Sequence, residues 1–243
     1  MKNTYTPNTK TSNMNSTSKP RKAFAIRKAN VHSECQTNDE QLRMESIAIM
    51  RHCQFYVDTC SLLNGNGHAK LRKLARTLND WGKTLYVPAC VVSELKKQKQ
   101  RGGRLAKHAA RLLRRIAKKT QAGLLKICNP ETAGQYADKA IMRIFANLPA
   151  GEKALLITED RPLAAALSAA NRTANGAVLG RFAACKLNGA GYPVPLQGLG
   201  GSCAQELQLL RPSFPANITF CQYAYKRSDW EGVLEEDLAA EWA

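Results

Sequence analysis

Short apolar runs alternate with longer amphipathic stretches through the middle of the chain. The runs are about five residues long and rich in Leu, Ile, Val and Tyr, and they occupy residues 53–58, 84–88, 123–128 and 153–160. Runs of this length and composition are typical of parallel strands that are buried on both faces. The pattern therefore predicts four strands of a mostly parallel sheet.

The segments between these runs have the spacing of helices. Pro162 opens a helical segment at a position where proline is favourable. Another helix is predicted over residues 38–52, with Asn38 as its N-cap. Three more segments place apolar side chains on one stripe, namely residues 68–81, 104–119 and 136–148. Strands that alternate with helices in this way predict an α/β fold, a doubly wound sheet flanked by helices.

The ends of the chain differ in composition from this central part. Residues 1–37 are rich in Asn, Thr, Ser and Lys with few large apolar side chains, so we predict a disordered basic arm. The predicted folded domain covers residues 38–182, and a C-terminal extension covers residues 183–243. In the extension the pattern predicts a Gly- and Pro-rich loop, a late strand and an acidic helix, over residues 187–202, 217–225 and 228–243.

The positive charge is concentrated in the first half of the chain. The protein has 36 Lys and Arg against 19 Asp and Glu, a net charge of +17. Residues 1–126 carry 26 basic and 7 acidic side chains, whereas residues 127–243 carry 10 and 12. Such an excess favours a polyanionic partner, nucleic acid before an anionic membrane.

The excess is greatest between Lys96 and Lys126, where 12 Lys and Arg residues occur without an acid. A solvated helix face normally mixes both signs, so this stretch favours a surface that binds phosphates. It contains no aromatic residue, and we expect backbone contact rather than base stacking. The predicted RNA-binding residues are Lys96, Lys97, Lys99, Arg101, Arg104, Lys107, Arg111, Arg114, Arg115, Lys118 and Lys119.

Membrane and zinc-binding classes are disfavoured by the composition. No apolar run reaches 18 residues, and the first residues contain no apolar stretch typical of a secretory signal. The eight cysteines have no CxxC spacing, so we expect reduced thiols and no structural zinc site. These features predict a cytoplasmic protein without a membrane partner.

Carboxylates follow the predicted strands. Asp58 and Asp160 end the first and fourth strands, and Glu94 and Asp138 lie in the helices after the second and third. In an open α/β sheet these positions share the edge at the carboxyl ends of the strands. Carboxylates gathered there repel one another unless a cation lies between them, and Mg²⁺ or Mn²⁺ suits such oxygen ligands. The sequence therefore predicts a metal site at this edge.

Four segments around these acids resemble the four acidic motifs of the PIN domain family, a metal-dependent ribonuclease fold. They read FYVDTCSLLN, YVPACVVSELKKQ, ADKAIMRIF and LLITEDRPLA, and the resemblance covers roughly residues 54–180. It implies a doubly wound sheet and cleavage of single-stranded RNA. It also implies that Thr59 supports the first acid and that Mg²⁺ or Mn²⁺ is held by Asp58, Glu94, Asp138 and Asp160.

Together these features predict a Mg²⁺- or Mn²⁺-dependent endoribonuclease, which hydrolyses phosphodiester bonds of single-stranded or structured RNA with a metal-activated water. Two alternatives stay open. Cys60 stands where the family usually has Ser or Asn, which leaves open an RNA-binding module with impaired catalysis. A metal-dependent deoxyribonuclease is the other. For the acidic residues 228–243, competition with RNA for the basic surface and simple packing on the core are both open.

Overall fold

The computed structural model describes residues 43–64, 67–198 and 202–212. All described residues belong to one compact unit, which begins at Leu42. The predicted basic arm, the late strand over 217–225 and the acidic helix over 228–243 lie outside the described residues. None of the described helices is long and apolar enough to span a bilayer.

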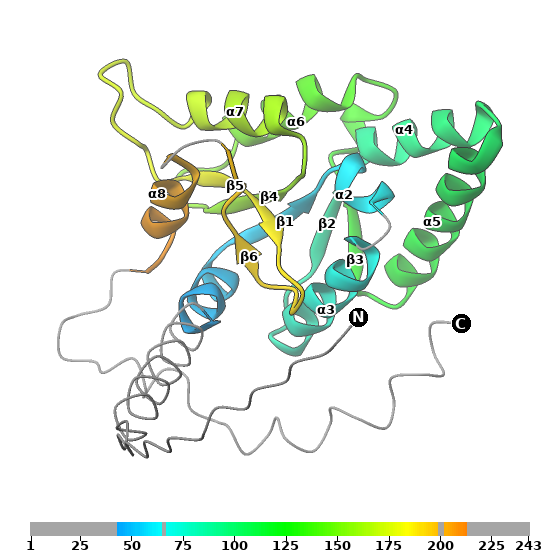
Figure 1. Ribbon diagram of the computed structural model, residues 1–243, viewed down its shortest axis with the longest axis horizontal. Helices are drawn as coiled ribbons and strands as arrows, with labels where there is room; N and C mark the ends of the chain where they lie inside the picture. Colours follow the sequence, from blue (N-terminus) through cyan, green and yellow to red (C-terminus); the bar gives the residue numbers. More distant parts are fainter. Residues whose placement is uncertain (1–42, 65–66, 199–201, 213–243) are drawn as a thin grey trace, which may run out of the picture. The chain divides into compact units, whose positions relative to one another are not determined.

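A six-stranded sheet forms the centre of the described unit, with the order β3-β2-β1-β4-β5-β6 (Figure 1). β1 to β5 are parallel to their neighbours, and β6 is antiparallel to β5. The sheet grows outward from β1 in one direction and from β4 in the other, which is compatible with a doubly wound fold. The strands are β1 (Gln54–Val57), β2 (Leu85–Pro88), β3 (Leu125–Cys128), β4 (Ala154–Ile157), β5 (Phe182–Leu187) and β6 (Pro193–Val194).

Helices flank this sheet. α3 and α4 contact β2, α5 contacts β3, and α7 and α8 contact β5, while α6 lies beside α7 (Figure 1). A first helical segment covers residues 43–52. The others are α2 (Thr59–Leu63), α3 (Gly67–Asp80), α4 (Ala89–Gln100), α5 (Gly103–Gln121), the 3-10 helix η1 (Pro130–Thr132), α6 (Ala137–Ala146), α7 (Arg161–Ala170) and α8 (Ser202–Leu209). The predicted α/β class with a mostly parallel sheet is thus confirmed.

The central strands are buried because layers of side chains cover them. All four residues of β4 are buried, as the apolar run predicted. The ring of Phe145 on α6 packs edge-on against Tyr56 of β1 and Phe182 of β5, with ring centroids 5.3 and 5.5 Å apart. Burial of such aromatic side chains contributes strongly to stability. The core therefore fixes the two strands, β1 and β4, whose ends carry Asp58 and Asp160.

Three strands of the sheet differ from the prediction. β3 was expected to be buried on both faces, but Lys126 and Ile127 are exposed, because β3 is an edge strand that pairs only with β2. β5 was not predicted, since its buried centre consists of small residues, Ala183, Ala184 and Cys185, rather than branched ones. The predicted domain end at residue 182 falls on the first residue of β5. β6 lies within the predicted loop over 187–202.

Two lysines close the ends of helices near the start of two strands. The ammonium group of Lys83, just before β2, donates to the carbonyl oxygens of Met50, Arg51 and Cys53 at the end of the first helix. Lys153, just before β4, donates in the same way to the carbonyls of residues 209–211 at the end of α8. Cations at helix C-termini satisfy the last carbonyls and complement the helix dipole.

Candidate carboxylate site and basic surface

Asp58 is the most buried of the predicted site residues. It follows β1 directly, and its side chain is 4% exposed. One carboxylate oxygen, Oδ1, accepts the backbone N–H of Thr59 at 2.6 Å and caps α2. Aspartate is favoured at such a position because it satisfies a backbone N–H that has no partner inside the helix. The strand end and the start of the helix thus fix this carboxylate in place.

The second oxygen of Asp58, Oδ2, accepts two side-chain hydrogen bonds. The thiol of Cys60 lies 2.9 Å away and the hydroxyl of Thr158 lies 3.0 Å away. Burial, followed by the negative charge of Asp58, raises the pKa of Cys60 to about 11, so the thiol keeps its proton at neutral pH and donates it. Cys60 therefore supplies a hydrogen bond to the first acid of the site, although a thiol is a weaker donor than a hydroxyl.

Thr158 joins the ends of the two central strands. Its hydroxyl donates to Asp58 after β1 and accepts the backbone N–H of Asp160 at 3.0 Å. Asp160 in turn caps α7, because its Oδ1 accepts the N–H of Leu163 at 2.9 Å. Sequence reasoning did not single out Thr158. Its only signal is a hydroxyl placed directly after a fully buried strand, which is common at strand ends.

Glu94 reaches the same edge from α4. It lies six residues after Pro88 and is half-buried. The hydroxyl of Thr59 donates to Glu94 Oε2 at 2.7 Å. Thr59 therefore contacts two of the predicted acids, Asp58 through its backbone N–H and Glu94 through its side chain.

Asp138 lies in the first turn of α6 and is half-buried. Burial raises its pKa, and the negative charges of Asp58, Asp160 and Glu94 raise it further. The four acids thus lie close enough for their charges to act on Asp138. Glu159 is exposed and accepts a hydrogen bond from the Asn64 amide.

The structure brings the four carboxylates to one edge without closing them into a cluster. Over residues 43–64, 67–198 and 202–212, no three His, Cys, Asp or Glu side chains are grouped closely enough to hold a metal ion. The donor set nevertheless suits a hard divalent cation, since all four candidate ligands are carboxylates. The pKa of Asp138 is raised first by burial and then by the negative charges of Asp58, Asp160 and Glu94, and a cation would offset those charges.

The basic surface, defined as the predicted RNA-binding residues 96–119, lies on the end of α4 and on α5. Ten of its Lys and Arg side chains are exposed, and Lys119 is half-buried. The opposite stripe of α5 is buried through Ala106, Ala109, Leu112 and Ile116. Gly102 and Gly103, with φ angles of 79° and 77°, separate the two helices in a conformation that favours glycine.

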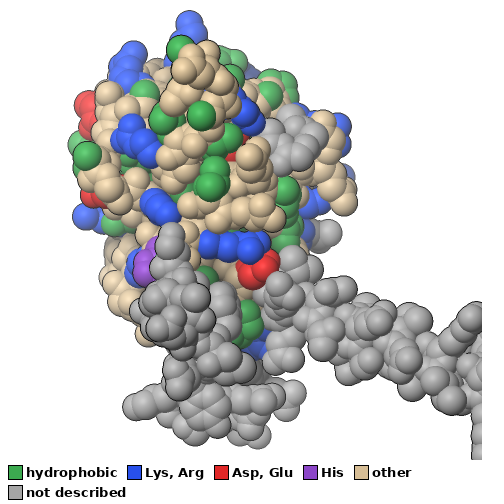
Figure 2. Space-filling view, turned by 90° about the vertical axis from the view of Figure 1, so that its left-hand side faces the viewer, with side chains coloured by type: hydrophobic (Ala, Val, Ile, Leu, Met, Phe, Trp, Pro, Cys, Tyr) green, Lys and Arg blue, Asp and Glu red, His purple; other side chains and the backbone are tan. Residues whose placement is uncertain are grey.

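This surface adjoins the carboxylates. α2, which begins at the Asp58 cap, contacts both α4 and α5. The face on the side where α8 lies in Figure 1 is different, because its basic side chains stand apart from one another and one lies against an acidic side chain (Figure 2). Near α8, Arg211 pairs with Glu45 at 2.6 Å. The face near α8 therefore lacks the one-signed charge of α4 and α5.

Comparison of the chain with protein-family models, with curated proteins and with solved structures finds no match in any of the three. The candidate site is therefore defined by its own residues and their contacts.

Proposed function

We propose that the protein is a Mg²⁺- or Mn²⁺-dependent endoribonuclease of the PIN-like type. This proposal rests on one observation: four carboxylates lie at the same edge of the sheet, and each comes from a different strand end or helix. The negative charges of the other three acids contribute to the raised pKa of Asp138, so the four acids share one electrostatic environment. The adjoining basic surface supports a phosphate-containing substrate.

Asp58, Glu94, Asp138 and Asp160 would hold the ion, for which at least three of them must draw closer together than they lie in this structure. When bound, the ion supplies activation of water and stabilisation of the charge that develops at the phosphodiester. The remaining steps belong to the protein. Thr59 and Thr158 hold Asp58, and Thr59 also holds Glu94, so the acids keep their orientation before substrate arrives. Such preorganisation lowers the cost of reaching the productive geometry.

The basic surface would bind the RNA backbone and deliver it to the carboxylates. Its side chains are exposed and repeat along α5 without an acid, which suits contact with successive phosphates. Contacts of this kind carry little sequence preference. RNA is proposed over DNA because the acidic motifs resemble those of a ribonuclease family, and a deoxyribonuclease remains the competing activity for the same geometry.

The test is cleavage of labelled single-stranded RNA by the full-length protein with Mg²⁺, with Mn²⁺ or with EDTA. Asp160→Asn removes one charge while keeping a residue that caps α7 well. Asp80→Asn makes the same change at an exposed position at the end of α3 and is the matched control. We expect metal-dependent cleavage by the wild type and by Asp80→Asn, and its loss in Asp160→Asn.

Other outcomes separate the alternatives. RNA binding without products under any metal would favour a binding module. Faster cleavage of single-stranded DNA of equal sequence would favour a deoxyribonuclease. Cleavage that persists in EDTA, or at the wild-type rate in Asp160→Asn, would contradict the proposed site. Mn²⁺ should also raise the Tm of the wild type by mass action, with about 2.7 kcal/mol of stabilisation at a hundredfold excess over Kd.

A further inference from the structure

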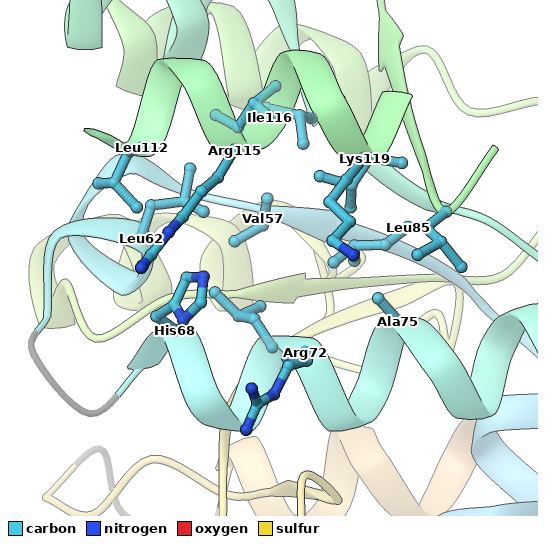
Figure 3. Close-up of a pocket in the computed structure, with 14 residues that line it drawn as sticks. Val57, Leu62, His68, Arg72, Ala75, Leu85, Leu112, Arg115, Ile116 and Lys119 are labelled. Carbon is cyan, nitrogen blue, oxygen red and sulfur yellow. The ribbon is translucent and has the colours of Figure 1, made fainter. Parts of the chain in front are cut away.

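A cavity lies between α3 and α5, above β1 and β2 (Figure 3). Its volume is about 50 Å³, several times the space that one water molecule occupies on the same measure. Its lining is almost entirely apolar and buried, with Val57, Leu85 and Val87 from the strands, Leu71 and Ala75 from α3, and Leu112 and Ile116 from α5. The two helices therefore leave an apolar space above the sheet.

Basic side chains surround this apolar space. Arg115 and Lys119 extend from α5 toward α3, and Arg115 reaches toward His68 (Figure 3). Burial, followed by the charges of the neighbouring Arg115, Arg72, His108 and Lys119, lowers the pKa of His68 to about 4. His68 is therefore neutral at pH 7. No acid occurs among the described residues that line the cavity, and this lining favours an anion.

A second histidine near the cavity has an unused polar atom. His108 lies one turn before Leu112 on α5, and it is one of the groups that lower the pKa of His68. Among the residues that the structure describes, its Nε2 atom is buried and has no hydrogen-bond partner. Burial of an unpaired polar atom is unfavourable. His108 does not itself line the cavity, so a ligand there would reach this atom only by extending past the lining residues.

The cavity is also connected to the carboxylate site through the chain. Val57, on its floor, immediately precedes Asp58. Leu62, on its wall, belongs to α2, the helix that Asp58 caps. A group seated in the cavity would therefore be held at a fixed position relative to the carboxylates.

We propose that the cavity receives the base of one nucleotide of the bound RNA, whose phosphate contacts Arg115 and Lys119. The proposal rests on the RNA binding proposed above and adds a base site to the phosphate contacts of the basic surface. A nucleotide combines a flat ring with an adjacent anion, which is the combination that this lining and these cations fit. Arginine and histidine planes are surfaces on which unstacked RNA bases pack. The inserted base would select which phosphate reaches the acids.

The competing ligand of similar chemistry is a fatty acid, with its chain in the cavity and its carboxylate on the same cations. The nucleotide is favoured because Arg115 and Lys119 belong to the same helix as Arg111, Arg114 and Lys118, which continue the positive charge along α5. A single carboxylate can contact only part of that extended positive charge, whereas the successive phosphates of an RNA backbone can contact all of it.

The test measures binding of the full-length protein to single-stranded RNA in EDTA, so that cleavage does not enter. Ala75→Leu fills the cavity without changing charge, and Ala69→Leu makes the same change at an exposed position of α3. We expect Ala75→Leu to weaken binding about tenfold, within the range of losses measured for single base contacts. Its salt dependence should stay that of the wild type, because the phosphate contacts remain. Ala69→Leu should bind like the wild type.

A second measurement changes the RNA instead of the protein. Wild-type protein should bind an abasic strand of the same length more weakly than the intact strand, and Ala75→Leu should not distinguish the two. Equal binding of both strands by the wild type, or equal binding by Ala75→Leu and Ala69→Leu, would overturn the base site and leave the nuclease proposal standing. No RNA binding by the wild type would overturn both. Stabilisation by dodecanoate that Ala75→Leu abolishes, without any base dependence, would assign the cavity to a fatty acid instead.

Discussion

The carboxylate site and the basic surface are built in opposite ways. Asp58 is buried and held by three hydrogen bonds, from the Thr59 backbone, the Cys60 thiol and the Thr158 hydroxyl. The basic surface consists of exposed side chains that repeat along one helix and the end of another. Each residue of the carboxylate site makes contacts of its own, whereas the side chains of the basic surface resemble one another. We therefore expect single changes to act strongly on the site and weakly on the surface.

The largest effect is expected from Asp58→Asn. The change removes one negative charge from the site and should abolish RNA cleavage. RNA binding should stay the same or become tighter, since less negative charge opposes the backbone. Parallel cleavage and binding assays check this, with thermal unfolding to show that the variant folds. A variant that cleaves at the wild-type rate would remove Asp58 from the site.

The basic surface should respond to several changes together. Reversal of Arg111, Arg114, Arg115 and Lys118 to Glu should weaken RNA binding for all sequences. It should also flatten the dependence of log K on log salt by about 0.7 for each lost phosphate contact on a single strand. Binding titrations from low to moderate salt check this. An unchanged slope would mean that these side chains are only a solvated helix face, and the contrast between the two regions would fail.

A smaller effect is expected at Thr158, which touches both strand ends. Thr158→Val keeps the shape of the side chain and leaves the buried Asp58 and the N–H of Asp160 each without one partner. The loss should lower the free energy of unfolding by about 1–3 kcal/mol. Chemical denaturation checks the stability. Thr158→Ser keeps the hydroxyl and should restore most of the loss, and equal stability of the Val variant would show that these bonds contribute nothing.

The smallest effect concerns pH, where His68 beside the cavity and Asp138 of the carboxylate site should differ in sign. The pKa of His68, lowered to about 4 in the fold, lies below its unfolded value of 6.5. The unfolded chain therefore binds more protons, and stability should fall as pH falls from about 6.5 to 4. The pKa of Asp138 is raised in the fold, so its contribution should increase as the solution is acidified.

Unfolding measured from pH 7 to pH 4 separates these two contributions. The His68→Gln variant should lose less stability than the wild type as pH falls. The Asp138→Asn variant should lack the stabilisation that Asp138 contributes at low pH. Curves for both variants that run parallel to the wild type would show that neither group is perturbed by its surroundings.

The sequence predicts well what depends on local pattern and on topology. The branched apolar residues of β4 mark a buried strand, and parallel topology alone brings Asp58 and Asp160 to one edge. The strand β5 was not predicted because Ala183, Ala184 and Cys185 are buried without being strongly hydrophobic. The role of Thr158 and the cavity were not predicted for another reason. Their significance depends on distances between β1 and β4 and between α3 and α5, and a linear pattern contains no such distances.

Lys83 and Lys153 give the lysines of this protein two classes of chemical reactivity. Each of the two ammonium groups donates to three carbonyl oxygens at a helix end, so an acylating reagent must first break these bonds. Exposed amines on α4 and α5, such as that of Lys107, face no such barrier. Acylation in a cell or a test tube would therefore neutralise the basic surface first, and it would reach the two helix-closing lysines only after the helix ends they hold had opened.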